Sequence, residues 1–139
     1  MLGAVRHKGF IPWDDDIDLM MFRDQYDKLC SIAQTEFNHP YFFQTEYTDP
    51  GSMRQHAQLR NSLTTGILTK EKGKNFKFNQ GIFIDIFPLD GLSENEAAEE
   101  KRRTMAQDVQ KAYELAGSGK LDTPECRRML ANIERQNHT

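Results

Sequence analysis

The sequence lacks the features that mark three common classes of protein. No apolar stretch approaches the roughly 20 residues of a membrane-spanning helix, so no such span is predicted. Arg6, His7 and Lys8 interrupt the N-terminal region, which therefore does not resemble a signal peptide. The net charge of −3 leaves no basic excess of the kind that nucleic-acid-binding domains carry. We therefore expect no transmembrane segment and no nucleic-acid partner.

Cysteine is also scarce. The chain has two, Cys30 and Cys126, and each falls on the apolar face of a predicted helix. Such positions favour reduced core residues of a cytosolic protein over a disulfide. With 139 residues, 37% of them apolar, and no repeat, the chain is expected to form one domain with its own core. A cytoplasmic location is expected, with peripheral association with the inner membrane face as an alternative.

The most informative segment is an acidic run between apolar residues, residues 10–21 (FIPWDDDIDLMM). Four carboxylates occur within five positions, and from Asp16 onward the pattern predicts a β-strand. Side chains alternate along a strand, so Asp16 and Asp18 share one face while Ile17 and Leu19 share the other. Two unpaired carboxylates side by side repel by about 1–4 kcal/mol. A cation that neutralises them is therefore expected.

A second strand is predicted at residues 81–87 (GIFIDIF), where Asp85 interrupts an apolar run. A run of this kind is typical of a strand buried on both faces, and a lone carboxylate there needs a partner. If the two strands pair, Asp85 converges with Asp16 and Asp18. Mg²⁺ binds one or two carboxylates together with substrate phosphates and waters, and a pair of ions stabilises both the attacking and the leaving oxygen. The pattern predicts Mg²⁺ (or Mn²⁺) held against a nucleotide's phosphates.

The acidic run has three other possible interpretations. An EF-hand loop starting at Asp14 would need glycine where Leu19 stands and a bidentate Glu where Gln25 stands. The aspartate pattern of prenyl synthases is present in residues 14–18, but that chemistry uses it on a helix, and Pro12 with the following β-prone residues argues for a strand. A solvated acidic turn, as most charge runs are, is the remaining alternative.

The rest of the chain predicts an α+β fold. A helix is expected at residues 24–37, β-structure at 41–47, a hairpin made by residues 57–60 and 64–68, and a basic loop at 70–77. Two further helices are expected, one opened by a capping box of Ser93 and Glu96 and one starting near Thr123. Residues 1–91 would then form a sheet-containing part of the domain and residues 92–139 a helical part.

Two segments together resemble the LicD family of phosphotransferases. Residues 2–18 (LGAVRHKGFIPWDDDID) are similar to the family's long signature, and residues 83–91 (FIDIFPLDG) to its second acidic strand. The resemblance implies a nucleotidyltransferase-type fold, with a small mixed sheet flanked by helices. It also implies transfer of a phosphorylated alcohol, typically phosphocholine from CDP-choline, onto a sugar hydroxyl of a cell-surface glycan.

The resemblance also assigns roles to individual residues. Asp16 and Asp18 match the family's metal-binding pair, Asp85 matches a third acidic position that binds metal or accepts the acceptor's proton, and Asp14 is a further candidate ligand. Substrate-binding roles fall on a second group of residues: Arg6, His7, Lys8 and Arg60 for the donor phosphates, and Trp13 as scaffold or as a ring that stacks on a base or a choline headgroup.

The family usually carries a strand and a glycine-led turn ahead of the Leu2–Val5 segment and continues beyond the last helix. We therefore expect a truncated relative, in which activity is more in doubt than fold. Two alternatives to the phosphocholine transferase stay open: a plain nucleotidyltransferase, and a metal- or nucleotide-binding module without turnover.

Overall fold

The computed structural model describes residues 3–52, 54–117, 123–124, 126–129 and 131. The chain divides into two compact units, Met1–Asp90 and Gly91–Thr139, so the boundary lies one residue before the division expected from the sequence. None of the helices in the described ranges is long and apolar enough to cross a membrane.

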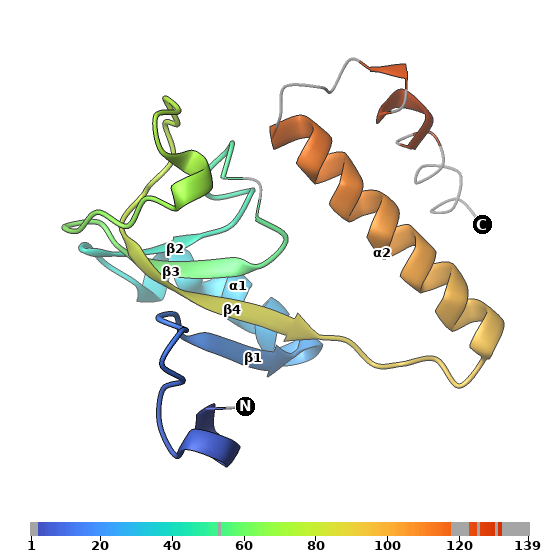
Figure 1. The fold of residues 1–139 in the computed structure, drawn as a ribbon, viewed down its shortest axis with the longest axis horizontal. Helices are drawn as coiled ribbons and strands as arrows, with labels where there is room; N and C mark the ends of the chain where they lie inside the picture. Colours follow the sequence, from blue (N-terminus) through green and yellow to red (C-terminus); the bar gives the residue numbers. More distant parts are fainter. Residues whose placement is uncertain (1–2, 53, 118–122, 125, 130, 132–139) are drawn as a thin grey trace. The chain divides into compact units, whose positions relative to one another are not determined.

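The first unit is built on a small mixed sheet, which confirms the α+β fold class (Figure 1). The strands lie in the order β1-β4-β3-β2. β1 pairs with β4 in parallel, whereas β3 pairs antiparallel with both β4 and β2. Their bounds are Asp18–Phe22 for β1, Tyr41–Gln44 for β2, Ala57–Asn61 for β3 and Ile82–Leu89 for β4.

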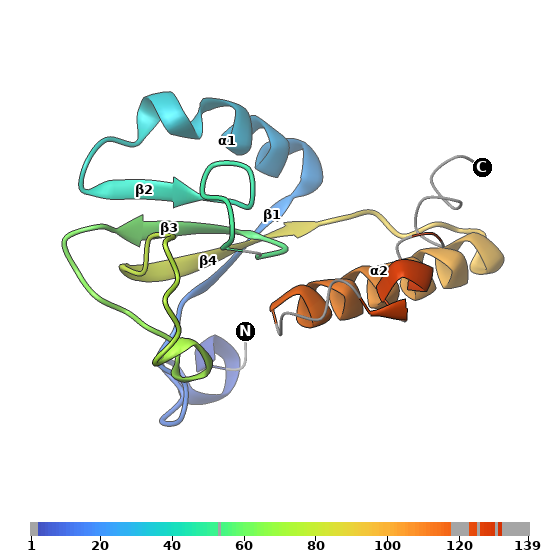
Figure 2. The same cartoon turned by 90° about the horizontal axis from the view of Figure 1, so that it is seen from above.

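One face of this sheet packs against helix α1, Arg23–Glu36, which lies within one residue of the predicted helix. Figure 2 shows α1 on this face, and the turns at Gly3–His7 and Thr69–Glu71 on the other. Tyr26 and Ala33 of α1 are buried against strand residues of the apolar face, namely Phe43, Ala57 and Ile86. This apolar contact is the core of the first unit, and it leaves the opposite face of the sheet for polar side chains.

β4 runs through Pro88, where the sequence predicted that the strand would stop. The Asp85 N–H donates to the Ile17 carbonyl oxygen, so alternate residues along β4 direct their backbone groups toward β1. The nitrogen of Pro88 therefore faces the other side. On that side lies β3, but its first residue, Ala57, pairs with Ile86, so β3 does not reach the position opposite Pro88. A proline that donates no hydrogen bond is tolerated at such an open edge.

The predicted hairpin of residues 57–60 and 64–68 is wrong in its second half. β3 forms, but β2 and β4 occupy its two edges. Residues 64–68 instead close the start of β4: the Ile82 N–H donates to Thr64 Oγ1 at 2.8 Å, and the Gly66 N–H donates to the Gln80 carbonyl oxygen at 2.7 Å.

The two ends of the β1–β4 pair differ in charge. At the far end Arg23, which follows β1, donates from Nε to Asp90 Oδ1 at 2.6 Å and from a terminal nitrogen to Asp90 Oδ2 at 2.8 Å. At the near end Asp18 lies opposite Asp85. An ion pair therefore joins the two strands at one end, while two carboxylates face each other at the other end.

The second unit contains helix α2, Glu96–Gly117. Its N-terminal cap differs from the predicted capping box. Asn95 Oδ1 accepts the N–H of Ala98, and the Glu99 carboxylate, not that of Glu96, accepts the N–H of Ser93. The box is displaced because Asn95 is an equally good cap and lies directly before the helix. Residues 124, 126–129 and 131 are helical where the last helix was predicted.

Candidate functional site

A row of polar side chains crosses the sheet on the face opposite α1. Asp18 of β1 pairs with Asp85 of β4, Asp85 with Gln58 of β3, and Gln58 with Gln44 of β2. Residues in register on neighbouring strands point to the same face. The four side chains therefore form one continuous polar line, with two carboxylates at one end and two amides at the other.

The carboxylates converge as predicted. Asp16, Asp18 and Asp85 each offer a carboxylate oxygen, and these oxygens lie within 4.8 Å of one another. β1 begins at Asp18, two residues later than expected, but the bond from the Asp85 N–H to the Ile17 carbonyl oxygen keeps the preceding segment alongside β4. Asp16 is thereby held beside Asp18 and Asp85 without being part of the strand.

The charges of the cluster act on one another. Asp14 is exposed, and a hydrogen bond and charge repulsion from Asp16 raise its pKa. Burial alone would raise the pKa of Asp85, but hydrogen bonds from His56 and Gln58 outweigh it and leave that pKa below its usual value. Asp85 is therefore ionised at neutral pH, in a cluster where other carboxylates already repel one another.

His56 and Gln58 fix the orientation of Asp85. His56 Nε2 lies 2.8 Å from Asp85 Oδ1, and Gln58 Nε2 donates to the same oxygen at 2.6 Å. The His56 ring also packs on Phe87, with centroids 4.3 Å apart. Both partners use Oδ1, and no hydrogen bond to the other oxygen of Asp85 is formed within the part of the chain that the structure describes. The sequence interpretation gave His56 no role, although polar residues at every second position, 56, 58 and 60, already indicated a polar strand face.

A groove of about 690 Å³ opens beside the carboxylates. It is walled by the segment that precedes β1, including Lys8, Phe10 and Ile11, and by three acidic residues, Asp14, Asp16 and Asp18. Of the cationic residues predicted at the N-terminus, Lys8 lines this groove. Its φ of 53° is a left-handed conformation that few non-glycine residues adopt. The groove thus combines a carboxylate cluster with one nearby ammonium group.

Arg6, His7 and Trp13 form a separate exposed group. The Arg6 guanidinium lies 5.6 Å from the centroid of the Trp13 ring, and His7 meets the same ring edge-on at 5.6 Å. Trp13 is 69% exposed. None of these three side chains is among the described residues that line the groove. The Arg6 guanidinium covers part of the Trp13 ring.

Arg60, the expected phosphate ligand, lies elsewhere. Its side chain is 1% exposed. The guanidinium donates to Gln44 Oε1, to Gln58 Oε1 and to the Gly81 carbonyl oxygen at 2.5–2.7 Å, and it lies 4.6 Å from the Phe83 ring centroid. Burial lowers its pKa to about 10. Three of its five N–H donors are used internally, and one of them supports Gln58, which in turn donates to Asp85.

The donor set suits a hard divalent cation. Three carboxylate oxygens are the ligand type that Mg²⁺ and Mn²⁺ prefer. Two oxygens on opposite sides of a Mg²⁺ ion lie about 4.2 Å apart, twice the metal–oxygen distance. Adjacent oxygens on the ion lie about 3 Å apart, so the oxygens of the cluster, within 4.8 Å of one another, are near enough to share one ion after the side chains adjust. The residues present therefore fit the predicted metal.

Comparison with known proteins gives the family. The model of the LicD/FKTN/FKRP nucleotidyltransferase domain matches residues 1–116. The chain belongs to the LicD/FKTN/FKRP family. The match includes every residue of the carboxylate cluster and the whole sheet, so the family signature and the convergent geometry fall in the same part of the molecule.

Two known proteins are similar in sequence to part of this chain. The lipopolysaccharide cholinephosphotransferase LicD of Haemophilus influenzae is 37% identical over 98 residues, which are 66% of this chain and 33% of that protein. An uncharacterized protein of Rickettsia prowazekii, RP689, is 33% identical over 88 residues, 63% of this chain and 30% of that protein. The match thus spans about a third of either relative's length. No solved structure matches significantly.

Proposed function

We propose that this chain carries the metal-binding part of a LicD-type phosphotransferase, which moves phosphocholine from CDP-choline to a sugar hydroxyl of a cell-surface glycan. The observation that carries the proposal is the convergence of Asp16, Asp18 and Asp85 on one face of the sheet. The name of the Haemophilus relative, a lipopolysaccharide cholinephosphotransferase, supports the choice of transferred group and the glycan acceptor.

In this proposal Asp16, Asp18 and Asp85 hold Mg²⁺ or Mn²⁺, with Asp14 as a candidate for a further ligand. The bound cation would supply neutralisation of the charge that develops on the transferring phosphoryl group. Asp85 suits the ligand role better than the role of general base. Two donors hold one of its oxygens, and an oriented carboxylate of this kind is typical of metal sites whose ligands are fixed by outer hydrogen bonds.

The remaining groups of the site would orient the donor. Lys8 lines the groove beside the acidic residues. Its ammonium group is therefore the cation best situated for a donor phosphate. Trp13, with Arg6 and His7 against its ring, offers an exposed aromatic surface for a base or for the choline cation. The proposal includes a cytoplasmic location, peripheral to the inner membrane face when the acceptor is membrane-bound, because a charged donor does not cross an apolar bilayer unaided.

Two alternatives have specific support. A plain nucleotidyltransferase agrees with the family's description and would release pyrophosphate from a nucleoside triphosphate. A binding module without turnover agrees with the carboxylate cluster, because the same three ligands would hold a cation whether or not a reaction follows. The three differ in their products: CMP from CDP-choline, pyrophosphate from CTP, or neither.

The decisive experiment compares Asp18→Asn with Asp24→Asn. Asp24 is an exposed carboxylate of α1, on the opposite face of the sheet. We expect CMP release from CDP-choline, with Mg²⁺ and a sugar acceptor, to fall by at least about a hundredfold in Asp18→Asn and to be unchanged in Asp24→Asn. Calorimetry of Mg²⁺ with CDP provides a second readout that does not depend on turnover.

Equal turnover by the two variants would disprove the assignment of Asp18. Metal and CDP binding without either product would favour the binding module, and pyrophosphate release from CTP would favour the nucleotidyltransferase.

A further inference from the structure

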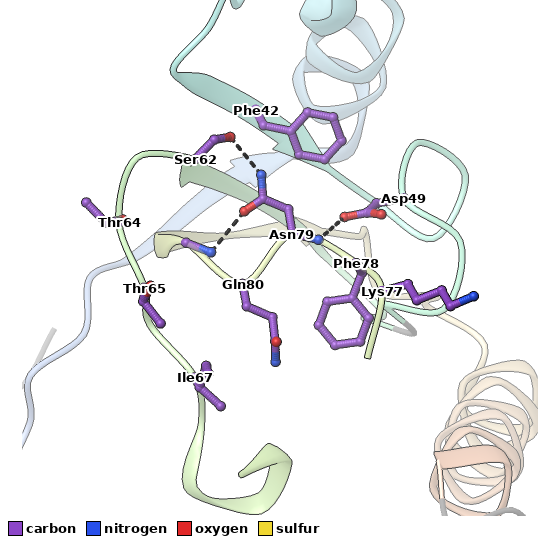
Figure 3. A pocket seen from close by; sticks show the side chains of 11 residues that line it. Phe42, Asp49, Ser62, Thr64, Thr65, Ile67, Lys77, Phe78, Asn79 and Gln80 are labelled. Carbon is purple, nitrogen blue, oxygen red and sulfur yellow. Dashed lines mark hydrogen bonds between the residues drawn. The ribbon is translucent and has the colours of Figure 1, made fainter. Parts of the chain in front are cut away.

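A second cavity, of about 610 Å³, lies toward the other edge of the sheet (Figure 3). It is lined by Phe42 of β2, by Ser62 just after β3, and by residues 77–81, which lead into β4. Asp85 is four residues further along β4 than Gly81, about 13 Å in an extended strand. We propose that this cavity binds a sugar residue of the acceptor chain, a short distance from the sugar whose hydroxyl is modified. The inference rests on the proposed transfer to a glycan.

The chemistry of the lining favours a neutral, hydroxyl-rich ligand. Lys77 and Asp49 contribute one charge of each sign, and the other lining residues in the described part of the chain are uncharged hydroxyl, amide, apolar and glycine residues. This balance contrasts with the first groove, where Asp14, Asp16 and Asp18 call for a cation. A phosphate would find a single lysine, whose side chain points away from Gln80 in Figure 3, whereas a sugar could use the hydroxyl and amide groups as donors and acceptors.

Gln80 supplies the most direct indication of a ligand. Its Nε2 is buried, and no acceptor among the described residues reaches it. Figure 3 shows the side chain pointing into the middle of the cavity, between Ile67 and Phe78. Buried amide nitrogens are nearly always hydrogen-bonded, so an unsatisfied one needs an explanation. A rotation of this amide would turn the nitrogen into the cavity, where a hydroxyl or ring oxygen of a bound sugar would provide the missing acceptor.

The wall around Gln80 is held in place by other bonds. Asn79 donates from its backbone N–H to Asp49 at 2.8 Å and from its side chain to Ser62 at 2.7 Å, and it accepts the Gly81 N–H at 2.9 Å. A side chain on Gly81 would collide with the Asn61 carbonyl group, so the backbone here is closely packed. The cavity wall is therefore preorganised, which lowers the entropy cost of binding.

The same network reaches the carboxylates. Gln44 donates to Asp49 and to the Asn79 carbonyl oxygen, and it accepts a bond from Arg60. Arg60 in turn bonds Gln58, which bonds Asp85. The cavity and the metal-binding cluster thus share one rigid polar layer, as expected if a ligand in the first must be aligned with chemistry at the second.

A cytosine base of the donor is the main competing occupant. The Phe78 ring does not favour it, because Phe78 is 6% exposed and packs against Phe76 with centroids 4.9 Å apart. That ring offers little open surface on which a base could stack. The first groove, which borders three of the acidic residues directly, is the better place for the donor.

NMR titration of the isotope-labelled chain tests the proposal. The probe is the delipidated core oligosaccharide released from lipopolysaccharide by mild acid, with inorganic phosphate and Mg²⁺–CDP titrated separately. We expect the oligosaccharide to shift the side-chain amide signal of Gln80 and the backbone signals of residues 77–81. Gln80→Met should weaken this binding by about five- to tenfold, as expected for one lost hydrogen bond. Gln25→Met, an exposed glutamine of α1, is the matched control.

Gln80→Met also separates binding from folding. It removes a buried donor without a partner, so the melting temperature without sugar should stay the same or rise. The proposal is overturned if the oligosaccharide leaves the Gln80 signal unmoved at millimolar concentration, if Gln80→Met binds it as well as the wild type, or if phosphate or Mg²⁺–CDP moves the same signals. Shifts caused by Mg²⁺–CDP near Asp16, Asp18 and Asp85 test the proposed function independently of this result.

Discussion

The two faces of the sheet come from the same strands but have opposite roles. On β3, Ala57 and Leu59 face α1 and the core, whereas Gln58 and Arg60 face the polar layer. A step of one residue therefore moves from a side chain that stabilises the fold to one that supports the site. Substitutions at neighbouring positions should therefore have different consequences, one for stability and the next for the site.

The largest effect is expected for Phe43→Ala on the core face. Phe43 is 1% exposed, and truncating a buried phenylalanine costs about 3–5 kcal/mol of unfolding free energy. The adjacent Phe42, which is half-buried on the other face, should cost clearly less when changed to alanine. Urea denaturation measures both variants. Equal losses would show that the polar face contributes as much to stability as the core.

Alkaline pH should weaken the core face through Tyr26. Burial raises the pKa of Tyr26 to about 12, from 10. Above pH 10 the unfolded chain loses the proton while the folded chain keeps it. The free energy of unfolding should therefore fall between pH 10 and pH 12, by on the order of 2 kcal/mol. Tyr26→Phe should remove this loss, and Tyr47→Phe, at an exposed tyrosine, should not. Parallel pH profiles for the wild type and Tyr26→Phe would contradict the assignment.

A smaller effect is expected for His56→Ala on the polar face. Removing a partner that orients a metal ligand typically costs at least about tenfold in metal affinity. Calorimetry with Mn²⁺ and CDP should show this weakening, while His39→Ala, at an exposed histidine outside the polar row, should bind as the wild type does. Equal Mn²⁺ affinity in the two histidine variants would disprove the proposed positioning role of His56.

The smallest effect on stability is expected for Asp16→Asn. Without metal the variant should melt at the same temperature as the wild type or slightly higher, because one repelling charge is gone. If Mg²⁺ binds as proposed, it should stabilise the native state of the wild type by mass action, and this rise in melting temperature should shrink in the variant. An undiminished rise would remove Asp16 from the proposed ligands.

The sequence predicted those parts of the site in which local pattern and tertiary structure agree. The alternation around Asp18 and the single carboxylate in the run of Asp85 indicated two strands and a shared cluster, and both are present. The α1 helix was predicted from its apolar spacing to within one residue. For both strands and for α1, the spacing of apolar and polar residues along the sequence depends only on which face of the element is buried.

The features that the sequence did not reveal depend on long-range partners. Nothing local distinguishes Arg60 as a buried residue, because its burial depends on acceptors supplied by Gln44 and Gly81 from other segments. Residues 64–68 resemble a strand, yet both edges of β3 were already taken. His56 lies 29 positions from Asp85, so its contact became visible only when the strand register was known.

The opposite charges at the two ends of the β1–β4 pair have a consequence for how this edge of the sheet opens. Among the described strands β1 pairs only with β4, so that single ladder protects only those amide hydrogens of β1 that point toward β4. The ion pair of Arg23 with Asp90 secures one end, while repulsion between Asp18 and Asp85 loosens the other. Fraying should therefore begin at the carboxylates, with faster hydrogen exchange near Asp18 than near Phe22. A divalent cation would close this end, so that occupancy of the site and protection of the edge strand rise together.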